Sequence, residues 1–375
     1  MDTAINELKA LEYPQSRYIY DQSVEQIFTQ IRAPSKSGFQ PIPEQYACAT
    51  RVRMPVQCLG FILLDSVEMN IATRFTSRYA ELERVRARRS DEEKSAFEIW
   101  HTDSQRDGII ARAIENMRGD AKKYARGNLL FDLIEQCNYL MDHINIPAYF
   151  PSILVSIVCQ RILTKSTSNP IKMLDISAGW GDRLIAALAL GYSYTGCDPN
   201  SRLGPVYSHI IQDLAHMAPK DAQYRVHSTP FEDWHPAPEE TQSYDVLFSS
   251  PPFFDYEVYS DEPTQSIRRY TRIETWINTF MMPSLEKAHT LLKPGAYIVL
   301  HLQDIITAKQ TIAFTEIILH YCLNHLHWKL MGKYIYTHHN PKKQEAIDER
   351  PFCNGFRTNT TGHIRVQILW VMQKT

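Results

Sequence analysis

The feature that most limits the fold of this chain is a regular alternation of strand-like and helix-like segments from about residue 145 onward. Alternation of this kind predicts a parallel sheet with helices on both faces. Five strand-like segments are "IKMLDIS", "YSYTGCDPN", "QYRVHST", "YDVLFSS" and "AYIVLHLQD". Two more, "WKLMGKYIYTHH" and "HIRVQILWVMQ", are predicted to close the sheet as a hairpin. We therefore expect an α/β fold with a Rossmann-like, doubly wound, mostly parallel sheet of seven strands.

The first 125 residues do not share this alternation. They contain a proline-rich loop over residues 33–45 and a mixed-charge helical segment over residues 74–102. We predict a mainly helical accessory or recognition region over residues 1–125 and the α/β domain over residues 126–375. The helical segment carries a basic cluster, which is either a solvated helix face or a phosphate-contacting patch. Its members are Arg84, Arg86, Arg88 and Arg89.

Composition excludes several classes of function. The net charge of -2 excludes a generally basic nucleic-acid coat, so any contact with a polyanion must depend on a local patch. The 7 cysteines are scattered without a CxxC pair, which predicts a reducing compartment and no metal site. The N-terminus lacks a signal-peptide pattern, and no apolar run approaches the roughly 20 residues that span a bilayer. We expect an intracellular, soluble protein, cytoplasmic or nuclear, with no membrane partner.

Three loops follow predicted strands, and ligands of doubly wound sheets bind at such strand ends. The first, "LDISAGWGDRL", contains Asp175 and two glycines, and glycine lets a ligand approach the backbone closely. The second brings Asp198 about 20 residues further on, where an acid commonly binds ribose hydroxyls. The third contains Phe231 and Glu232, either of which could flank an adenine ring. Taken singly, Asp175 could instead cap a helix and Asp198 could form a turn.

Four segments in order resemble a known family. "LDISAGWGDRL", "YTGCDPN", "YDVLFSSPPFFD" and "LLKPGAYIVLHLQD" are similar to motifs of the class I S-adenosylmethionine-dependent methyltransferases. The "SPPF" within the third resembles the [D/N/S]-P-P-[Y/F/W] motif of the branch that methylates amino groups of nucleic-acid bases. The resemblance covers roughly residues 145–375 and implies that residues 126–375 form a class I methyltransferase domain. The chain departs from the family's F-x-G-x-G pattern, because Ser177 stands where the leading phenylalanine is expected.

The resemblance implies S-adenosylmethionine as the cofactor. It assigns the glycine turn to the methionine part, Asp198 to the ribose, and the aromatic pair in "NIPAYFPS" to packing on the cofactor. The cofactor-binding residues expected on this basis are Tyr149, Phe150, Asp175, Ser177, Gly179, Gly181, Asp198, Pro199 and Phe231.

The "SPPF" turn suits chemistry on an aromatic amine. The lone pair of an exocyclic amine is delocalised into the ring, and acceptors that hold its hydrogens localise it for attack. The Ser250 hydroxyl and the Pro251 carbonyl are two such acceptors, and together with Pro252 the proline pair restricts the backbone that aims them. Phe253 offers a face on which a base can stack. Alternatively, the turn is only a rigid loop whose phenylalanines lie in the core.

Residues beyond the turn are expected to contact the substrate. Phe254, Asp255 and Tyr256 follow directly, and Phe254 is the better candidate of the two phenylalanines for a core position. A long polar segment over residues 337–363 is either a functional loop or a surface hairpin. Its candidates for contact with a polyanion are Lys342, Lys343 and Arg357.

The combined prediction is methyl transfer from S-adenosylmethionine to cytosine N4 or adenine N6. A leading serine is more typical of cytosine-N4 enzymes, and DNA is slightly favoured over RNA. The expected partner is a nucleic acid, with a partner chain or a homodimer as a further possibility. Two alternatives stay open: a protein methyltransferase, for example of glutamine amides, and a catalytically silent methyltransferase-like binding subunit. An asparagine at the first motif position would favour the glutamine reaction, and this chain has serine there.

Overall fold

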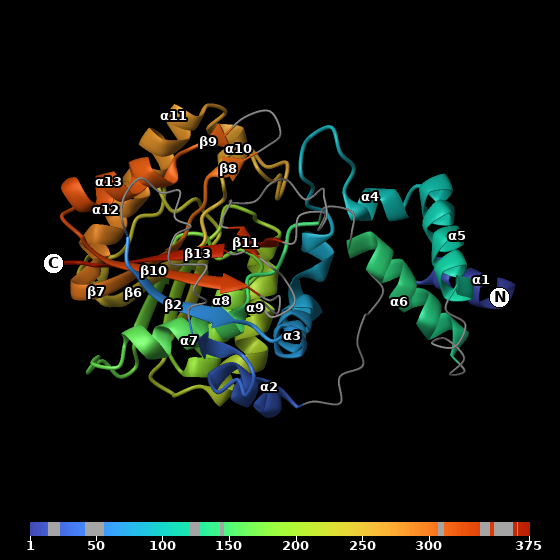
Figure 1. Ribbon diagram of the computed structural model, residues 1–375, viewed down its shortest axis with the longest axis horizontal. Coiled ribbons are helices and arrows are strands. Elements are labelled where there is room, and N and C mark those ends of the chain that lie inside the picture. Colours follow the sequence, from blue (N-terminus) through green and yellow to red (C-terminus); the bar gives the residue numbers. More distant parts are fainter. Residues whose placement is uncertain are drawn as a thin grey trace.

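The computed structural model of this protein is shown in Figure 1. The structure describes residues 1–13, 23–41, 56–119, 128–142, 146–306, 311–337, 346–348, 363–365 and 367–375. Lys342, Lys343 and Arg357 lie outside the described residues.

A nine-stranded sheet forms the centre of the molecule. Five adjacent strands of it are parallel, and the last strand runs antiparallel to both of its neighbours. In spatial order the strands are β1 (Gly38–Gln40), β2 (Cys58–Leu63), β10 (Lys329–Thr337), β13 (Gln367–Gln373), β7 (Leu292–His301), β6 (Tyr244–Ser249), β3 (Lys172–Asp175), β4 (Ser193–Cys197) and β5 (Tyr224–His227). The stretch from β10 to β5 is the doubly wound, mostly parallel sheet of seven strands that the sequence predicts, and the pairing of β10 with β13 confirms the closing hairpin.

Alternate residues of the strands feed two separate apolar cores, one on each face of the sheet. In β6, Val246 and Phe248 point to one core and Leu247 to the other. The first core is covered by α7 (Ser152–Ile162), α8 (Asp182–Leu190) and α9 (Leu203–Leu214). The second is covered by α12 (Met282–Leu291), α13 (Thr315–Asn324) and the π-helix Trp276–Met281. Helices on both faces are what the strand-helix alternation predicts.

Part of the N-terminal region belongs to this α/β body. Strand β2 pairs in parallel with β10, and β1 pairs with β2, so the sheet has two strands more than predicted. Helices α2 (Val24–Arg32) and α3 (Ser66–Arg84) bury Phe28 and Phe75 in the first core. The sheet edge and one face are therefore completed by residues that precede residue 85.

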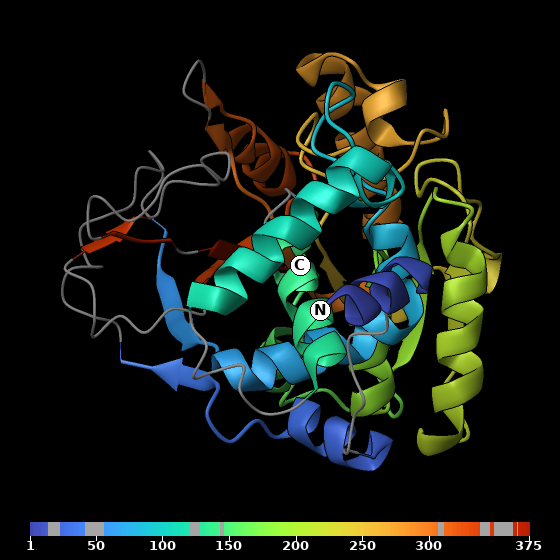
Figure 2. The same cartoon turned by 90° about the vertical axis from the view of Figure 1, so that its right-hand side faces the viewer.

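The remaining N-terminal helices form a cluster of their own at one side of the body (Figures 1 and 2). They are α1 (Asp2–Ala10), α4 (Ala96–Trp100), α5 (Asp103–Gly119) and α6 (Leu129–Asp142), packed around Trp100, Leu133 and Cys137. The functional division at residue 125 stays a prediction. The packing groups α6 with the earlier helices, and α2 and α3 with the sheet.

Shorter elements complete the described chain. They are the 3-10 turns Ala215–Met217 and Pro238–Glu240, helices α10 (Ser266–Arg269) and α11 (Ile273–Thr275), and the strand pairs β8 (Ile305–Ile306) with β9 (Thr311–Ile312) and β11 (Ala346–Asp348) with β12 (His363–Arg365). Over the described ranges, no helix combines the length and the apolar character needed to cross a bilayer.

Candidate active site

The strand order reverses between β3 and β6, and this switch point is where the two motif loops meet. The Ser177 hydroxyl after β3 donates to the Ser250 carbonyl after β6, with an O–O distance of 2.9 Å. It also lies 2.9 Å from the hydroxyl oxygen of Ser249, the last residue of β6. The glycine turn and the "SPPF" turn are thus hydrogen-bonded to each other and form one wall.

Asp175 supports this wall through buried hydrogen bonds and does not line the cavity. Its carboxylate is fully buried and accepts hydrogen bonds from Arg183 Nε at 2.6 Å, Tyr194 Oη at 2.7 Å and Ser249 Oγ at 2.7 Å. Arg183 donates in addition to the Ser177 carbonyl. The prediction that Asp175 contacts the cofactor is therefore replaced by a positioning role for its carboxylate.

The two glycines of the first loop differ in their relation to the cavity. Gly179 has a φ of +59° and lines the cavity, where its N–H donates to Asp198 Oδ2 at 2.9 Å. Gly181 has a φ of +94°, and a Cβ there would lie 2.7 Å from Ile210 Cδ1. Gly181 lies at the start of α8 and does not line the cavity, and its left-handed backbone conformation is the main reason for glycine there.

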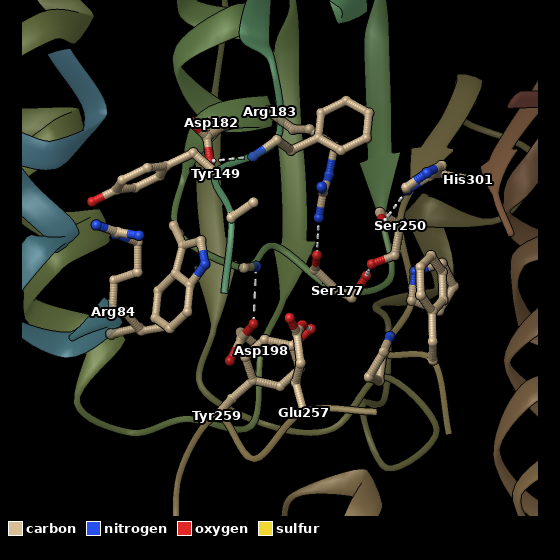
Figure 3. Close-up of a pocket in the computed structure, with 18 of the residues that line it drawn as sticks. Arg84, Tyr149, Ser177, Asp182, Arg183, Asp198, Ser250, Glu257, Tyr259 and His301 are labelled. Carbon is tan, nitrogen blue, oxygen red and sulfur yellow. Dashed lines mark hydrogen bonds between the residues drawn. The ribbon is translucent and has the colours of Figure 1, made fainter. Parts of the chain in front are cut away.

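Asp198 follows β4 and lines the cavity (Figure 3), and its hydrogen bond with the Gly179 N–H keeps it beside the glycine turn. Its second oxygen accepts from Asn200 N at 3.0 Å, so two backbone N–H groups hold the carboxylate in place. Burial raises the pKa of Asp198 to about 6. Pro199 lines the cavity next to it. This position at the end of the second strand is the one expected for a ribose-binding acid.

The aromatic pair before α7 also faces the cavity, and the N-terminal region holds it there. The Tyr149 hydroxyl donates to Glu81 Oε2 at 2.7 Å, and the Arg84 guanidinium lies 4.7 Å from the centre of the Tyr149 ring. The Arg183 guanidinium lies 5.2 Å from the centre of the Phe150 ring. Helix α3 therefore contributes Glu81 and Arg84 to a wall that the sequence assigned to the second half of the chain.

Asp182, the first residue of α8, is a carboxylate that the sequence did not single out. Its Oδ2 accepts from Phe150 N at 3.2 Å, and Oδ1 has no hydrogen-bond partner within the described ranges. The side chain is buried and lines the cavity, and burial raises its pKa to about 7. A buried carboxylate with an unused oxygen is suited to a cationic ligand group.

A third acidic group lies beside the predicted adenine site. Phe231 is buried under the cavity, and Lys287 fixes its loop by donating to the carbonyls of Phe231 and Glu232 at 2.8 and 2.7 Å. Glu232 Oε1 accepts from the Tyr270 hydroxyl at 2.7 Å. Its Oε2 is buried without a partner in the part of the chain that the structure describes. That oxygen is available to an amino group at the cavity wall.

The "SPPF" turn forms the opposite end of the cavity. Ser250, Pro251, Pro252 and Phe253 all line it. The Ser250 hydroxyl lies 2.9 Å from His301 Nδ1, and the Phe253 ring meets the His301 ring edge-on at 5.3 Å. No hydrogen bond of the described residues engages the Pro251 carbonyl. Both acceptors expected from the sequence are therefore present at this wall.

The next residues separate into core and rim. Phe254 has a φ of +43°, an uncommon value for a side chain of this size, and packs in the core with its ring centre 6.3 Å from that of Trp276. Asp255 is exposed, and neither Phe254 nor Asp255 lines the cavity. Their predicted contact with substrate is therefore not seen. Tyr256 does line the cavity, under the Arg89 guanidinium at 4.7 Å.

The basic cluster is largely neutralised within the molecule. Arg84 pairs with Glu81, Arg86 with Glu83, both at 2.8 Å, and Arg88 with Asp261 at 2.6 Å. Arg89 lines the cavity, as Arg84 does, but its Nε and Nη1 have no hydrogen-bond partner among the described residues. The cluster is thus neither a solvated helix face nor a continuous phosphate patch.

These walls enclose one cavity of about 690 Å³, which is in the range of small-molecule and cofactor sites. His301 is its most informative lining residue that the sequence did not single out. It is the last residue of β7 and lies within the predicted strand "AYIVLHLQD", where a polar residue was a usable signal. The predicted site residues that line the cavity are Tyr149, Phe150, Ser177, Gly179, Asp198, Pro199, Phe231, Ser250, Pro251, Pro252, Phe253 and Tyr256.

No family model matches this chain, and no curated protein matches it. Among solved structures, it is similar to an S-adenosylmethionine-dependent methyltransferase of Methanosarcina mazei, with 15% identity, 57% of this chain and 96% of that chain covered, and a TM-score of 0.34. It is also similar to magnesium protoporphyrin IX methyltransferase of Synechocystis, solved with bound S-adenosylmethionine (10% identity, 60% and 79% covered, TM-score 0.36). A third is an S-adenosylmethionine-dependent O-methyltransferase of Thermotoga maritima (10% identity, 64% and 70% covered, TM-score 0.34).

Similarities with such low scores assign no function. The strand order of the seven-stranded part, with β13 antiparallel inside an otherwise parallel doubly wound sheet, agrees with the fold predicted from the sequence.

Proposed function

We propose that this protein transfers a methyl group from S-adenosylmethionine to an exocyclic amino group of a nucleic-acid base, cytosine N4 or adenine N6. One observation carries the proposal. Ser250 and Pro251, which carry the hydroxyl and carbonyl acceptors, line the same cavity as the glycine turn, and the Ser177 hydroxyl joins the two turns. This arrangement suits an amine held next to the methyl end of a cofactor.

The described residues fit the cofactor. S-adenosylmethionine would supply an electrophilic methyl group on a sulfonium. Asp198 is placed to accept from the ribose hydroxyls. The unpartnered oxygen of Asp182 suits the ammonium of the methionine part, and the unpartnered oxygen of Glu232 suits the adenine amino group beside Phe231. The two orphaned buried oxygens support the presence of a ligand here, since buried polar atoms normally have partners.

The "SPPF" turn would prepare the amine. The two N–H groups of the target amine would donate to the Ser250 hydroxyl and the Pro251 carbonyl. These hydrogen bonds would localise the lone pair of the amine nitrogen toward the methyl group. Phe253 is only partly buried, so its exposed surface remains available for stacking, worth roughly 1–3 kcal/mol per base. A base in a duplex would first be flipped out of the stack at a cost of a few kcal/mol. The leading serine favours cytosine N4, and DNA is slightly preferred to RNA as the polymer.

The test is an incubation of the protein with methyl-labelled S-adenosylmethionine and separate pools of DNA, RNA and unfolded protein, followed by digestion and mass spectrometry. The proposal predicts label in N4-methylcytosine or N6-methyladenine. Ser250→Ala should lose most of this label and still bind the cofactor. Label found only in protein would replace the proposal by protein methylation. Cofactor binding without transfer to any pool would instead indicate a catalytically silent binding subunit.

A further inference from the structure

A line of buried polar contacts extends from the "SPPF" turn across the sheet, starting at the Ser250 hydroxyl 2.9 Å from His301 Nδ1. His301 Nε2 lies 3.4 Å from the Tyr336 hydroxyl oxygen, and that hydroxyl donates to Gln367 Oε1 at 2.5 Å. His301 and Tyr336 are 5% and 3% exposed, and both line the cavity. Ser250 directly follows β6, His301 is the last residue of β7, Tyr336 belongs to β10, and Gln367 is the first residue of β13.

The direction of these hydrogen bonds determines the tautomer of His301. The Tyr336 proton is used by Gln367, so the contact between His301 Nε2 and the Tyr336 oxygen is a hydrogen bond when Nε2 is the donor. The proton of the neutral ring is therefore on Nε2, and Nδ1 keeps its lone pair. Burial and the nearby Arg183 lower the pKa of His301 to about 3, so the ring is neutral in neutral solution. The hydrogen bond at Nδ1 is consequently donated by the Ser250 hydroxyl.

A serine at this position has a difficulty that an aspartate would not have. A carboxylate offers only lone pairs to an amine, whereas a hydroxyl carries a proton that can point at the amine and repel its N–H groups. An acceptor that holds this proton elsewhere leaves the oxygen lone pairs free for the cavity. His301 Nδ1 is such an acceptor, and the line behind it keeps its lone pair in place.

We propose that His301 is a positioning residue: it accepts the Ser250 hydroxyl proton and so directs the serine lone pairs toward the target amine. This rests on the proposed function for its consequence in catalysis, while the orientation of the hydroxyl is a property of the protein alone. Tyr336 and Gln367 act through His301 by fixing its tautomer.

The first test measures the tautomer of His301 in the full-length protein without any substrate. It uses long-range NMR correlations between the ring nitrogens and the carbon-bound ring hydrogens of nitrogen-15-labelled histidine at pH 7. His301 is assigned from the signal that disappears in His301→Asn. The expected result is a neutral ring protonated at Nε2. His289 serves as an internal reference for this form, because its Nδ1 accepts from Trp328 Nε1 at 2.7 Å. His101 serves for the other form, since its Nδ1 lies 2.8 Å from the Phe97 carbonyl. A ring protonated at Nδ1, or a charged ring, would overturn the proposal.

The second test is kinetic and uses the nucleic-acid pool that accepts label in the wild-type protein. His301→Leu should lower kcat at least tenfold and leave the KM for S-adenosylmethionine unchanged, because the serine still lines the cavity but is no longer oriented. His301→Asn keeps a polar group close to the Nδ1 position and should recover most of the loss, which a purely structural role would not explain. An undiminished kcat in His301→Leu would overturn the proposal.

The two tests separate this proposal from the proposed function. If the wild-type protein methylates no pool, the proposed function fails, and the NMR result still decides the orientation of the hydroxyl. If His301→Leu does not fold, the kinetics of His301→Asn and the tautomer measurement decide whether His301 orients the Ser250 hydroxyl.

Discussion

Phe253 and Phe254 are neighbours in the sequence, but they lie in different surroundings. Phe253 is partly buried and lines the cavity, whereas Phe254 packs against Trp276 in the core. We predict that Phe253→Ala lowers the rate of methyl transfer by up to about a hundredfold, the loss of roughly 1–3 kcal/mol of stacking. Its melting temperature should stay within a few degrees of the wild-type value.

Phe254→Ala is the matched control at the adjacent position. It should leave a cavity in the core and cost about 3–5 kcal/mol of folding free energy. Thermal melts and single-turnover rates on both variants separate the two roles. An early-melting Phe253→Ala protein that transfers methyl at the parental rate would show that the turn is scaffolding.

Asp182 should make folding stability depend on pH in an unusual direction. Its pKa is raised to about 7 by burial, so between about pH 4 and pH 7 the folded state binds more protons than the unfolded state. Stability should therefore fall as the pH rises through this window, by at most about 4 kcal/mol at about 1.4 kcal/mol per pKa unit. Denaturant unfolding at several pH values should show a shallower fall in Asp182→Asn. Equal slopes in both proteins would exclude a buried, protonated Asp182.

At the scale of elements, residues 85–91 are attached to the loop that follows the "SPPF" turn. Arg88 and Val258 exchange two backbone hydrogen bonds, with N–O distances of 3.0 and 2.8 Å. Asp261 pairs with Arg88, and Arg268 pairs with Asp91 at 2.5 Å. The N-terminal region therefore holds one side of the candidate target site, and Arg89 reaches the cavity from this attached segment.

Arg89 and Arg86 should differ in their effect on polynucleotide binding. Arg86 already pairs with Glu83, whereas Arg89 has donors in the cavity wall without hydrogen-bond partners among the described residues. We predict that Arg89→Gln reduces the slope of log affinity against log salt by about one unit, as expected for one lost phosphate contact. Arg86→Gln is the control and should keep the parental slope. The opposite order, measured by fluorescence anisotropy, would remove Arg89 from the binding surface.

The elements near the site were the most predictable from the sequence. Strand β3, the glycine turn and α8 follow from an apolar run, two glycines and a buried helix pattern that are contiguous in the chain. The "SPPF" turn follows in the same way from its proline pair. Asp182 and the contacts of His301 depend instead on which side chains remain unpartnered or meet across the sheet, and single-segment patterns do not contain that information.

At the scale of the whole molecule, the N-terminal region is part of the structure that supports the site. Removing residues 1–125 would delete β2 and helices α2 and α3, and with them the fully buried Phe28 and Phe75. We predict that a fragment of residues 126–375 does not fold cooperatively, because the first core would be opened to water. Circular dichroism melts of the fragment and the full chain provide the comparison. A cooperative melt of the fragment near the parental temperature would contradict this.

The extension of the sheet explains why the sequence did not reveal this dependence. Strand β2 pairs in parallel with β10, more than two hundred residues later, and β2 reads as an ordinary short apolar segment in a region without alternation. Strands so far apart in the sequence pair because the sheet has an open edge at β10, and the local periodicity of the sequence does not reveal that edge. The seven-stranded part was predictable because six of its strands are next to a helix of the repeating pattern and the last, β13, follows β10 as a hairpin partner.

The most direct test of the central claim, a cofactor site at the switch point, is calorimetric titration of S-adenosylmethionine into the full-length protein and two variants. Saturable binding is expected for the wild-type protein. Asp198→Ala should bind at least tenfold more weakly, a loss of about 1.4 kcal/mol. Asp255→Ala, at an exposed position outside the cavity, should bind like the parent. No saturable binding by the wild-type protein, or equal affinity in Asp198→Ala, would contradict the account.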